Sequence, residues 1–394
     1  MDLSRFENPA GRLAHLGQGE AAYRAFVPNP LPPELPVDTG LIRTCSDASY
    51  ALGELAAMGR TLPNPHLLIS PFLRREAVLS SRIEGTQADI ADLYAYEAEQ
   101  PPLPGMLPPP TSDVQEVLNY VRALEYGLER VETLPVSKRL MLELHECLLR
   151  GVRGEHATPG EFRRSQNWIG RPGSTLADAD FVPPPAPDML DALDGLERYI
   201  HNEEAPHPPL MRLAFIHYQF EAIHPFIDGN GRIGRLLISL LTVNWKLLPL
   251  PLLYLSAYFE RNRQTYYDLL MAVSTRSAWH DWVLFFLTGV AEQARDASDR
   301  AKRLQDLQMK WHQRLGRGRG STRLISLADH LFASPIISIP QAARVLGLSY
   351  PAAGNNVEKL VQADILKPMR RRTYGKPYVA QDILDIIMPN RAEN

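Results

Sequence analysis

Residues 224–235 have the sequence His-Pro-Phe-Ile-Asp-Gly-Asn-Gly-Arg-Ile-Gly-Arg. Gly229 and Gly231 flank an asparagine immediately before an apolar-periodic segment that predicts a helix. Glycines let the backbone bend so that its N–H groups can point inward, and a helix N-terminus adds the positive end of a dipole. The segment therefore predicts an anion-binding loop at the start of a helix.

The charged side chains of the same segment suit phosphate chemistry. Arg232 and Arg235 are three residues apart, so they share one helix face, and two guanidinium groups over an amide nest suit a polyphosphate. Asp228 supplies an oxygen ligand for Mg²⁺, and His224 is a candidate base for a hydroxyl nucleophile. A single histidine at a helix end usually packs, and Gly-Asn-Gly usually makes a turn. Their combination within one short segment favours a catalytic site.

The segment resembles the signature motif of the Fic family, His-x-Phe-x-Asp/Glu-Gly-Asn-Gly-Arg-x-x-Arg, and matches it at every specified position. The resemblance covers roughly residues 40 to 300. It implies a mainly α fold, with a helical Fic domain and a short β-hairpin flap. It also implies a protein adenylyltransferase, which transfers AMP from ATP to a Tyr, Thr or Ser hydroxyl of a protein and releases pyrophosphate.

The resemblance assigns roles to single residues. His224 would take the proton from the target hydroxyl, and Asp228 would hold Mg²⁺. The α-phosphate would lie against Asn230 and the flanking amides, and the two arginines would hold the β- and γ-phosphates. The residues expected to bind ATP and its phosphates are Gly229, Asn230, Gly231, Arg232, Ile233, Gly234, Arg235 and, as a base contact, Tyr267.

A second motif lies upstream. Residues 80–85, Ser-Ser-Arg-Ile-Glu-Gly, resemble the family's inhibitory motif, Ser/Thr-x-x-x-Glu-Gly/Asn. Ser80 and Glu84 are four residues apart, so they share one helix face. The resemblance implies that Glu84 pairs with Arg235 and displaces the γ-phosphate, so that ATP binds in an unproductive pose.

Residues 162–184 interrupt the helical pattern. Their apolar residues surround glycines and a proline, which predicts a short β-hairpin. The segment is similar to the family's substrate-clamping hairpin, and the flap residues expected to touch the target are Trp168, Ile169 and Gly170.

We expect three regions: an N-terminal helical region with the inhibitory motif at 1–110, the catalytic domain at 111–315 and a winged-helix domain at 321–394. The first 40 residues, rich in Pro and Gly, predict an irregular lead-in. A proline-rich break at 101–110 predicts the first boundary. The helices expected from apolar periodicity are 41–60, 71–99, one beginning at 112, one around 140–148, 186–201, 208–223, 231–246, 259–274 and 279–312.

The last region carries its own pattern. Three short helical segments precede two strand-like segments joined by a basic stretch, the order of a winged helix-turn-helix. Nine Lys/Arg and six Asp/Glu give residues 321–394 a charge of +3. The residues that would contact DNA are Asn355, Lys359, Arg370, Arg371 and Arg372. Winged helices also mediate protein contacts, so a DNA-binding regulator that uses the Fic domain as a nucleotide sensor is the alternative function.

Composition sets further bounds. The net charge of −3 excludes a basic coat over the whole chain, and two distant cysteines favour a reducing cytoplasm over a disulfide framework. The sequence shows no signal pattern and no apolar stretch near the ~20 residues of a membrane span. The sequence also lacks a P-loop, the kinase motifs and His-Glu-x-x-His. For the alternative of a metal hydrolase, the sequence offers only the pair His217 and His224, which is a weak signal.

The expected partners are an unidentified target protein and the chain itself. The oligomeric state stays open, although a homodimer would suit mutual control.

Overall fold

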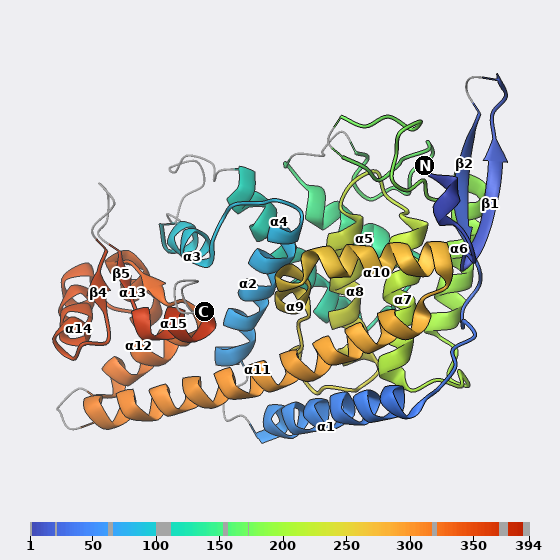
Figure 1. The fold of residues 1–394 in the computed structure, drawn as a ribbon. Coiled ribbons are helices and arrows are strands. Elements are labelled where there is room, and N and C mark those ends of the chain that lie inside the picture. Colours follow the sequence, from blue (N-terminus) through green and yellow to red (C-terminus); the bar gives the residue numbers. More distant parts are fainter. Residues whose placement is uncertain are drawn as a thin grey trace.

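The computed structural model describes residues 2–19, 22–61, 66–99, 112–152, 157–171, 173–316, 321–369 and 377–388. The described chain is mainly helical, as the sequence predicts (Figure 1). Besides a 3-10 turn at Leu3–Arg5, the helices up to the catalytic loop are α1 (Thr39–Thr61), α2 (His66–Ile83), α3 (Ile90–Glu99), α4 (Ser112–Arg130), α5 (Lys138–Leu149), α6 (Ala186–Ile200) and α7 (Pro209–Ile223). The helices beyond it, up to the C-terminal region, are α8 (Asn230–Asn244), α9 (Ser256–Arg261), α10 (Arg263–Arg276) and α11 (Trp279–Leu315).

The expected irregular lead-in is wrong, because the first residues form a β-hairpin. Strand β1 (Gly11–Leu16) pairs antiparallel with β2 (Tyr23–Pro28), with Leu13 opposite Phe26. The hairpin is anchored by Phe26, which is fully buried with its ring centroid 5.6 Å from that of Phe181. Its apolar alternation is weak in sequence, and such strands depend on tertiary packing more than on propensity.

The expected single helix at 71–99 is also wrong, because the chain forms α2 and α3 with a turn between them. Gly85 makes this turn with a φ of 101°, a conformation that favours glycine. The N–H of Thr86 returns to the Ser81 carbonyl at 3.2 Å. Pro71 lies inside α2 instead of starting it. The turn leaves Glu84 just beyond the end of α2, where its side chain can reach a neighbouring helix.

The core is continuous. Helix α1 lies along α11, which runs the length of the molecule, and α2 packs against α4 and α9 (Figure 1). Helices α7 and α8 pack together at the centre. One cluster of buried apolar side chains extends from Ala10 to Ile387, so the N-terminal helices share their core with the expected catalytic domain. None of the described helices combines the length and the apolar character of a membrane span.

The C-terminal region contains α12 (Ser321–Ala333), β3 (Ile336–Ile337), α13 (Ile339–Leu346), α14 (Tyr350–Gln362), β4 (Lys367–Pro368), β5 (Tyr378–Val379) and α15 (Gln381–Ile387). The strands form an antiparallel sheet in the order β3-β5-β4. The three expected helices are present, whereas β3 and α15 were not predicted. Helix α15 packs on α11 and α2. The expected DNA-contacting residues Arg370, Arg371 and Arg372 lie outside the described residues.

Candidate functional site

The site is built around the turn between α7 and α8. Helix α7 ends at His224, which has a left-handed φ of 49°, and α8 begins after Gly229, whose φ is 81°. A side chain at Gly229 would be strained, and its Cβ would come within 3.3 Å of Leu148. The N–H groups of the first turn of α8 have no partner inside the helix, as at every helix start. The turn therefore presents backbone donors at the positive end of α8.

Asn230 closes the loop with its side chain. Its Oδ1 accepts from the Phe226 N–H and its Nδ2 donates to the Phe226 carbonyl, both at 2.8 Å. Asn167 donates to the same carbonyl at 2.8 Å. The Asn230 amide is thus used inside the buried loop, and the α-phosphate contact expected of this residue has to come from its backbone N–H.

His145 on α5 holds the backbone of the loop at Asp228, and the sequence did not single this residue out. Its Nε2 lies 3.0 Å from the Asp228 carbonyl, and the Gly160 N–H donates to its Nδ1 at 3.1 Å. The imidazole stacks on Phe226 with centroids 3.8 Å apart. Burial lowers the pKa of His145 to about 4, so the ring is neutral and these bonds assign its proton to Nε2. The available signal was a histidine within the apolar stripe of α5.

His224 has the form of a neutral base. Arg163 holds its carbonyl with an Nε donor at 2.9 Å, and its Nδ1 lies 3.3 Å from the Glu221 carbonyl. The carbonyl can only accept, so the network assigns the ring proton to Nδ1 and leaves Nε2 free to accept one. Burial lowers the pKa of His224 to about 4, which keeps the imidazole neutral near pH 7.

Arg232 is buried with unused donors. Its NH1 is 3.7 Å from Glu116 Oε2 and its NH2 is 3.5 Å from Asp228 Oδ1. Among the described residues, its Nε and NH1 have no hydrogen-bond partner. Buried donors of this kind are costly unless a ligand satisfies them, and an anion would do so.

Asp228 stands at the mouth of the loop. Its carboxylate accepts the Gly229 N–H at 2.6 Å, and half of its side chain is exposed. Within the part of the chain that the structure covers, no three His, Cys, Asp or Glu side chains gather as a metal site. A Mg²⁺ ion at Asp228 would therefore take its other ligands from phosphate oxygens and water, the usual arrangement for this ion with nucleotides.

Glu84 and Ser80 accept hydrogen bonds from the Arg235 guanidinium group. The Arg235 NH2 donates to Glu84 Oε1 at 2.7 Å, and its Nε donates to Ser80 Oγ at 2.8 Å. Burial alone would lower the pKa of Arg235 and raise that of Glu84, but the charge of each group outweighs this, raising the arginine pKa and lowering the glutamate pKa. A Cβ at Gly231 would lie 2.4 Å from Glu84 Oε1. The carboxylate therefore fills the space over the first turn of α8.

Two of the expected phosphate-binding residues, Ile233 and Gly234, lie further along α8. The Ile233 side chain is fully buried, and its N–H is bonded to the Gly229 carbonyl at 3.0 Å. Gly234 faces α7, where a Cβ would come within 2.6 Å of Glu221 Oε1. Gly234 thus lies against α7 and the Ile233 side chain lies in the core, while their expected phosphate contacts stay predictions. The spacing of the motif could not show this packing, because spacing gives the position of a residue along its own helix and does not say which other helix packs against it.

The expected β-hairpin flap is a loop with a single antiparallel bridge between Ile169 and Phe181. Their backbone bonds measure 2.8 and 3.0 Å. Trp168 is 41% exposed and Ile169 is 39% exposed, so two neighbouring large apolar side chains are accessible here. Gly170 follows them directly, and Arg163, at the start of the segment, ties it to the His224 carbonyl. The segment thus borders the loop, and its described residues show one bridge in place of the expected two-stranded hairpin.

Tyr267 on α10 is partly accessible, whereas His217 is not. The Tyr267 ring lies 5.2 Å from the Tyr266 ring and beneath the Arg263 guanidinium, and the side chain is 39% exposed. His217 bonds the Tyr266 hydroxyl at 2.8 Å and stacks on Phe259 inside the core. His217 is therefore a packing residue of the core.

Comparison with known protein families matches two regions of this chain. Residues 42–129 match the profile described as Fic/DOC family N-terminal, and residues 135–242 match the Fic/DOC family profile. The chain contains Fic/DOC family domains. The inhibitory motif lies in the first matched region, and the loop of residues 224–235 lies in the second.

Curated relatives share part of the chain. The Protein adenylyltransferase Fic of Drosophila persimilis is 34% identical over 128 residues, which are 32% of this chain and 23% of that protein. The protein of the same name from Drosophila ananassae is also 34% identical over 128 residues, with 32% and 24% covered. The chain thus spans about a quarter of the length of the curated relatives that it matches.

Solved structures support the Fic/DOC fold. A Fic family protein from Desulfovibrio desulfuricans G20 matches with a TM-score of 0.56 and 22% identity, covering 89% of this chain and 98% of that one. Fic-1 (aa134–508) from C. elegans matches with a TM-score of 0.51 and 20% identity, covering 68% and 74%. At these identities the likeness concerns the fold.

Proposed function

We propose that this chain is a protein adenylyltransferase, which transfers AMP from ATP to a hydroxyl side chain of a protein. The observation that carries the proposal is the neutral His224 beside the N-terminus of α8, where Arg232 has unused donors. The printed name of the relatives, Protein adenylyltransferase Fic, supports the same activity.

In the proposed reaction, His224 Nε2 accepts the proton of the target hydroxyl while the hydroxyl oxygen attacks the α-phosphorus. The backbone donors at the start of α8 stabilise the negative charge that grows on the α-phosphate oxygens. Arg232 and Arg235 bind the β- and γ-phosphates, which leave as pyrophosphate. Mg²⁺, held by Asp228 and phosphate oxygens, would neutralise part of this charge. Tyr267 offers a ring face on which the base can stack.

We also propose that Glu84 inhibits this reaction. Its carboxylate takes a donor of Arg235 and fills the space over Gly231. A γ-phosphate cannot use that donor while the pair is formed. ATP would then bind with its α-phosphorus out of line with the hydroxyl. The same carboxylate could act on a water molecule and remove AMP, so both directions are tested below.

The exposed segment around Trp168 and Ile169 is the proposed clamp for the target. An extended chain can add to its backbone by strand addition, which positions a hydroxyl without selecting much sequence. The chain itself is one such target, through self-modification, and the other target proteins are unidentified.

The test uses the Glu84→Gly protein with Mg²⁺ and ATP labelled on either the α- or the γ-phosphate. We expect covalent label from α-labelled ATP alone and a mass increase of one AMP, with a weaker signal in the wild type. Label from γ-labelled ATP alone would show phosphoryl transfer instead. Label from neither, with ATP bound, would exclude both transfer reactions.

A second candidate function rests on the C-terminal region, which we propose is a winged helix. Asn355 and Lys359 are both exposed and lie four residues apart on α14, the third helix, where a DNA-reading helix would sit. If this face binds DNA, the full chain should retain duplex DNA at 50 mM salt and release it at 200 mM, because phosphate contacts are salt-sensitive. The Asn355→Ala/Lys359→Ala protein should lose retention while AMP transfer continues. Retention unchanged by this double substitution would argue against the DNA-binding role.

A further inference from the structure

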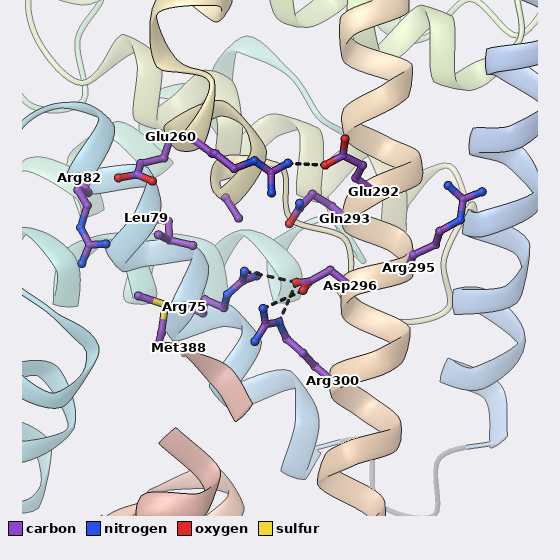
Figure 2. A pocket seen from close by; sticks show the side chains of 12 residues that line it. Arg75, Leu79, Arg82, Glu260, Glu292, Gln293, Arg295, Asp296, Arg300 and Met388 are labelled. Carbon is purple, nitrogen blue, oxygen red and sulfur yellow. Dashed lines mark hydrogen bonds and ion pairs between the residues drawn. The ribbon is translucent and has the colours of Figure 1, made fainter. Parts of the chain in front are cut away.

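A second pocket lies on the face of α2 away from the catalytic loop. It has a volume of about 730 Å³ and lies among α2, α9, α11 and the end of α15 (Figure 2). Arg75, Leu79 and Arg82 follow one another along α2 on its wall, and Asp296 and Arg300 stand on α11 across from Arg75. The volume falls within the range of small-molecule sites.

The positive charge of this pocket is incompletely neutralised. Its lining includes five arginines and three carboxylates, and Arg295 is paired with Asp47 outside the lining, which leaves an excess of one positive charge. Asp296 is shared, since Arg300 binds both of its oxygens at 2.8 Å while the Arg75 NH2 lies 3.4 Å away. One carboxylate thus faces two guanidinium groups, and burial followed by the charge of Arg300 lowers the pKa of Arg75 to about 10.

Two guanidinium groups retain donor capacity. The Arg75 side chain is only 13% exposed, and its Nε has no hydrogen-bond partner among the described residues. Arg82 is half-buried, and no ion pair joins it to the other residues drawn around the pocket (Figure 2). Buried cationic donors of this kind are satisfied best by a multivalent anion, which can accept several hydrogen bonds at once.

The pocket and the Glu84–Arg235 pair lie on opposite sides of α2. At 3.6 residues per turn, Arg75 and Arg82 lie on the face of α2 opposite to Ser80 and Glu84. Arg82 precedes Glu84 by two residues. In the structure, the pocket walls are assembled while Glu84 is paired with Arg235. A ligand that binds this arrangement must favour it over any arrangement in which α2 shifts to release Arg235.

We propose that this pocket is a regulatory site for a small organic phosphate with two or more negative charges, which binds Arg75 and Arg82 and holds Glu84 on Arg235. The regulatory part of this inference rests on the proposed function, whereas the binding site does not. The carbonyl of Ile386 accepts from Arg300, and Met388 lines the pocket, so the same ligand would touch the end of the C-terminal region.

The binding test uses 3-phosphoglycerate as the probe and calorimetry on the full chain without Mg²⁺. The Arg232→Ala substitution serves as the background, because it weakens any competing anion binding at the catalytic loop. We expect Arg82→Gln to weaken binding at least about fivefold in this background, Arg82→Lys to weaken it less, and Arg122→Gln, an exposed control on α4, to leave it unchanged. Arg75→Gln should act like Arg82→Gln, with thermal unfolding as the check on its fold.

Binding in the Arg232→Ala protein that neither Arg75→Gln nor Arg82→Gln changes would overturn the site, and so would the absence of binding in that background. The regulatory test measures AMP incorporation. The probe should lower incorporation by the wild type and should leave the Glu84→Gly and Arg82→Gln proteins unaffected. An equal fall in the Glu84→Gly protein would overturn the coupling. If Glu84→Gly incorporates no AMP at all, the proposed function fails, while calorimetry still decides the binding site.

Discussion

The catalytic loop at 224–235 and the clamp segment at 162–184 touch each other but are built in opposite ways. In the loop, buried side chains fix the backbone: Asn230 binds both polar groups of Phe226, and His145 binds the Asp228 carbonyl. In the clamp segment, Trp168 and Ile169 remain exposed around a single bridge. Under the proposed function, the chemistry would depend on preorganised backbone donors, and target binding would use an adaptable surface.

Replacement of the proposed base, His224, should have the largest effect on the rate of AMP transfer. His224→Ala, made in the Glu84→Gly protein so that the rate is measurable, should lower AMP transfer ~10²- to 10⁴-fold. ATP affinity should change little, because the side chain donates nothing to the phosphates. His280→Ala, at a partly exposed histidine on α11, is the matched control. A rate close to that of the parent protein would remove His224 from the role of base.

Replacement of the proposed metal ligand should have the next largest effect. Asp228→Ala should lower the Mg²⁺-dependent rate at least about tenfold, because a ligand to the ion is lost. Mn²⁺ should partly restore activity to Asp228→Glu, which keeps a carboxylate. Titration of the rate with each metal measures the effect. Full activity of the parent protein in excess chelator would contradict this role.

The clamp should respond differently from the loop. Ile169→Glu should lower modification of a target protein by about tenfold, because it places a charge where an apolar contact forms, while ATP affinity stays unchanged. Ile42→Glu on α1, at a residue 58% exposed, is the matched control. The two quantities are measured by label incorporation and by calorimetry. Equal losses in both would show that Ile169 stabilises the fold instead of binding the target.

A smaller effect is expected on the free energy of unfolding at acidic pH, because three buried histidines lie in or near the loop. Burial lowers the pKa values of His145, His217 and His224 to about 4, 3 and 4, from an ordinary value of 6.5. The unfolded chain then binds more protons than the folded one between about pH 6.5 and 4, so the free energy of unfolding should fall as the pH drops through this range. Urea midpoints at pH 7 and pH 5 measure it, and equal midpoints would contradict it.

Glu221 acts in the opposite direction. Burial raises its pKa to about 7 from 4.5, so the folded chain binds the extra proton and this stabilisation is lost as the pH rises towards 7. Glu221→Gln should therefore steepen the acid dependence, and His145→Gln should flatten it. An unchanged slope in both proteins would indicate that these groups do not titrate as their burial implies.

The sequence predicted the helices with strong apolar periodicity and the glycine turn at the start of α8, whereas anion binding by that turn stays a prediction. It could not predict the Gly85 turn, because Gly85 makes a C-terminal turn that a helical pattern conceals, nor the first hairpin, whose strands are stabilised by Phe26 and Phe181 from distant segments. In the site, the motif predicted the pairing of Glu84 with Arg235, which the structure contains, and its inhibitory effect stays a prediction. The role of His145 could not be predicted, because its hydrogen-bond partners are residues 160 and 228. A sequence pattern within one segment does not show contacts between distant segments.

The proposed inhibition of the loop rests on the pair Glu84–Arg235. Hydrogen bonds to charged groups contribute about 1.5–3 kcal/mol, so removing the carboxylate should raise the initial rate of AMP incorporation about 10- to 100-fold. The most direct measurement is a time course of label from α-labelled ATP for the wild type, Glu84→Gly and Glu84→Gly/His224→Ala, with removal followed on pre-labelled target. We predict faster addition by Glu84→Gly, an intermediate rate for Glu84→Asp and loss of the gain in the double substitution. If Glu84→Gly shows neither faster addition nor slower removal of AMP, the account of this site is contradicted.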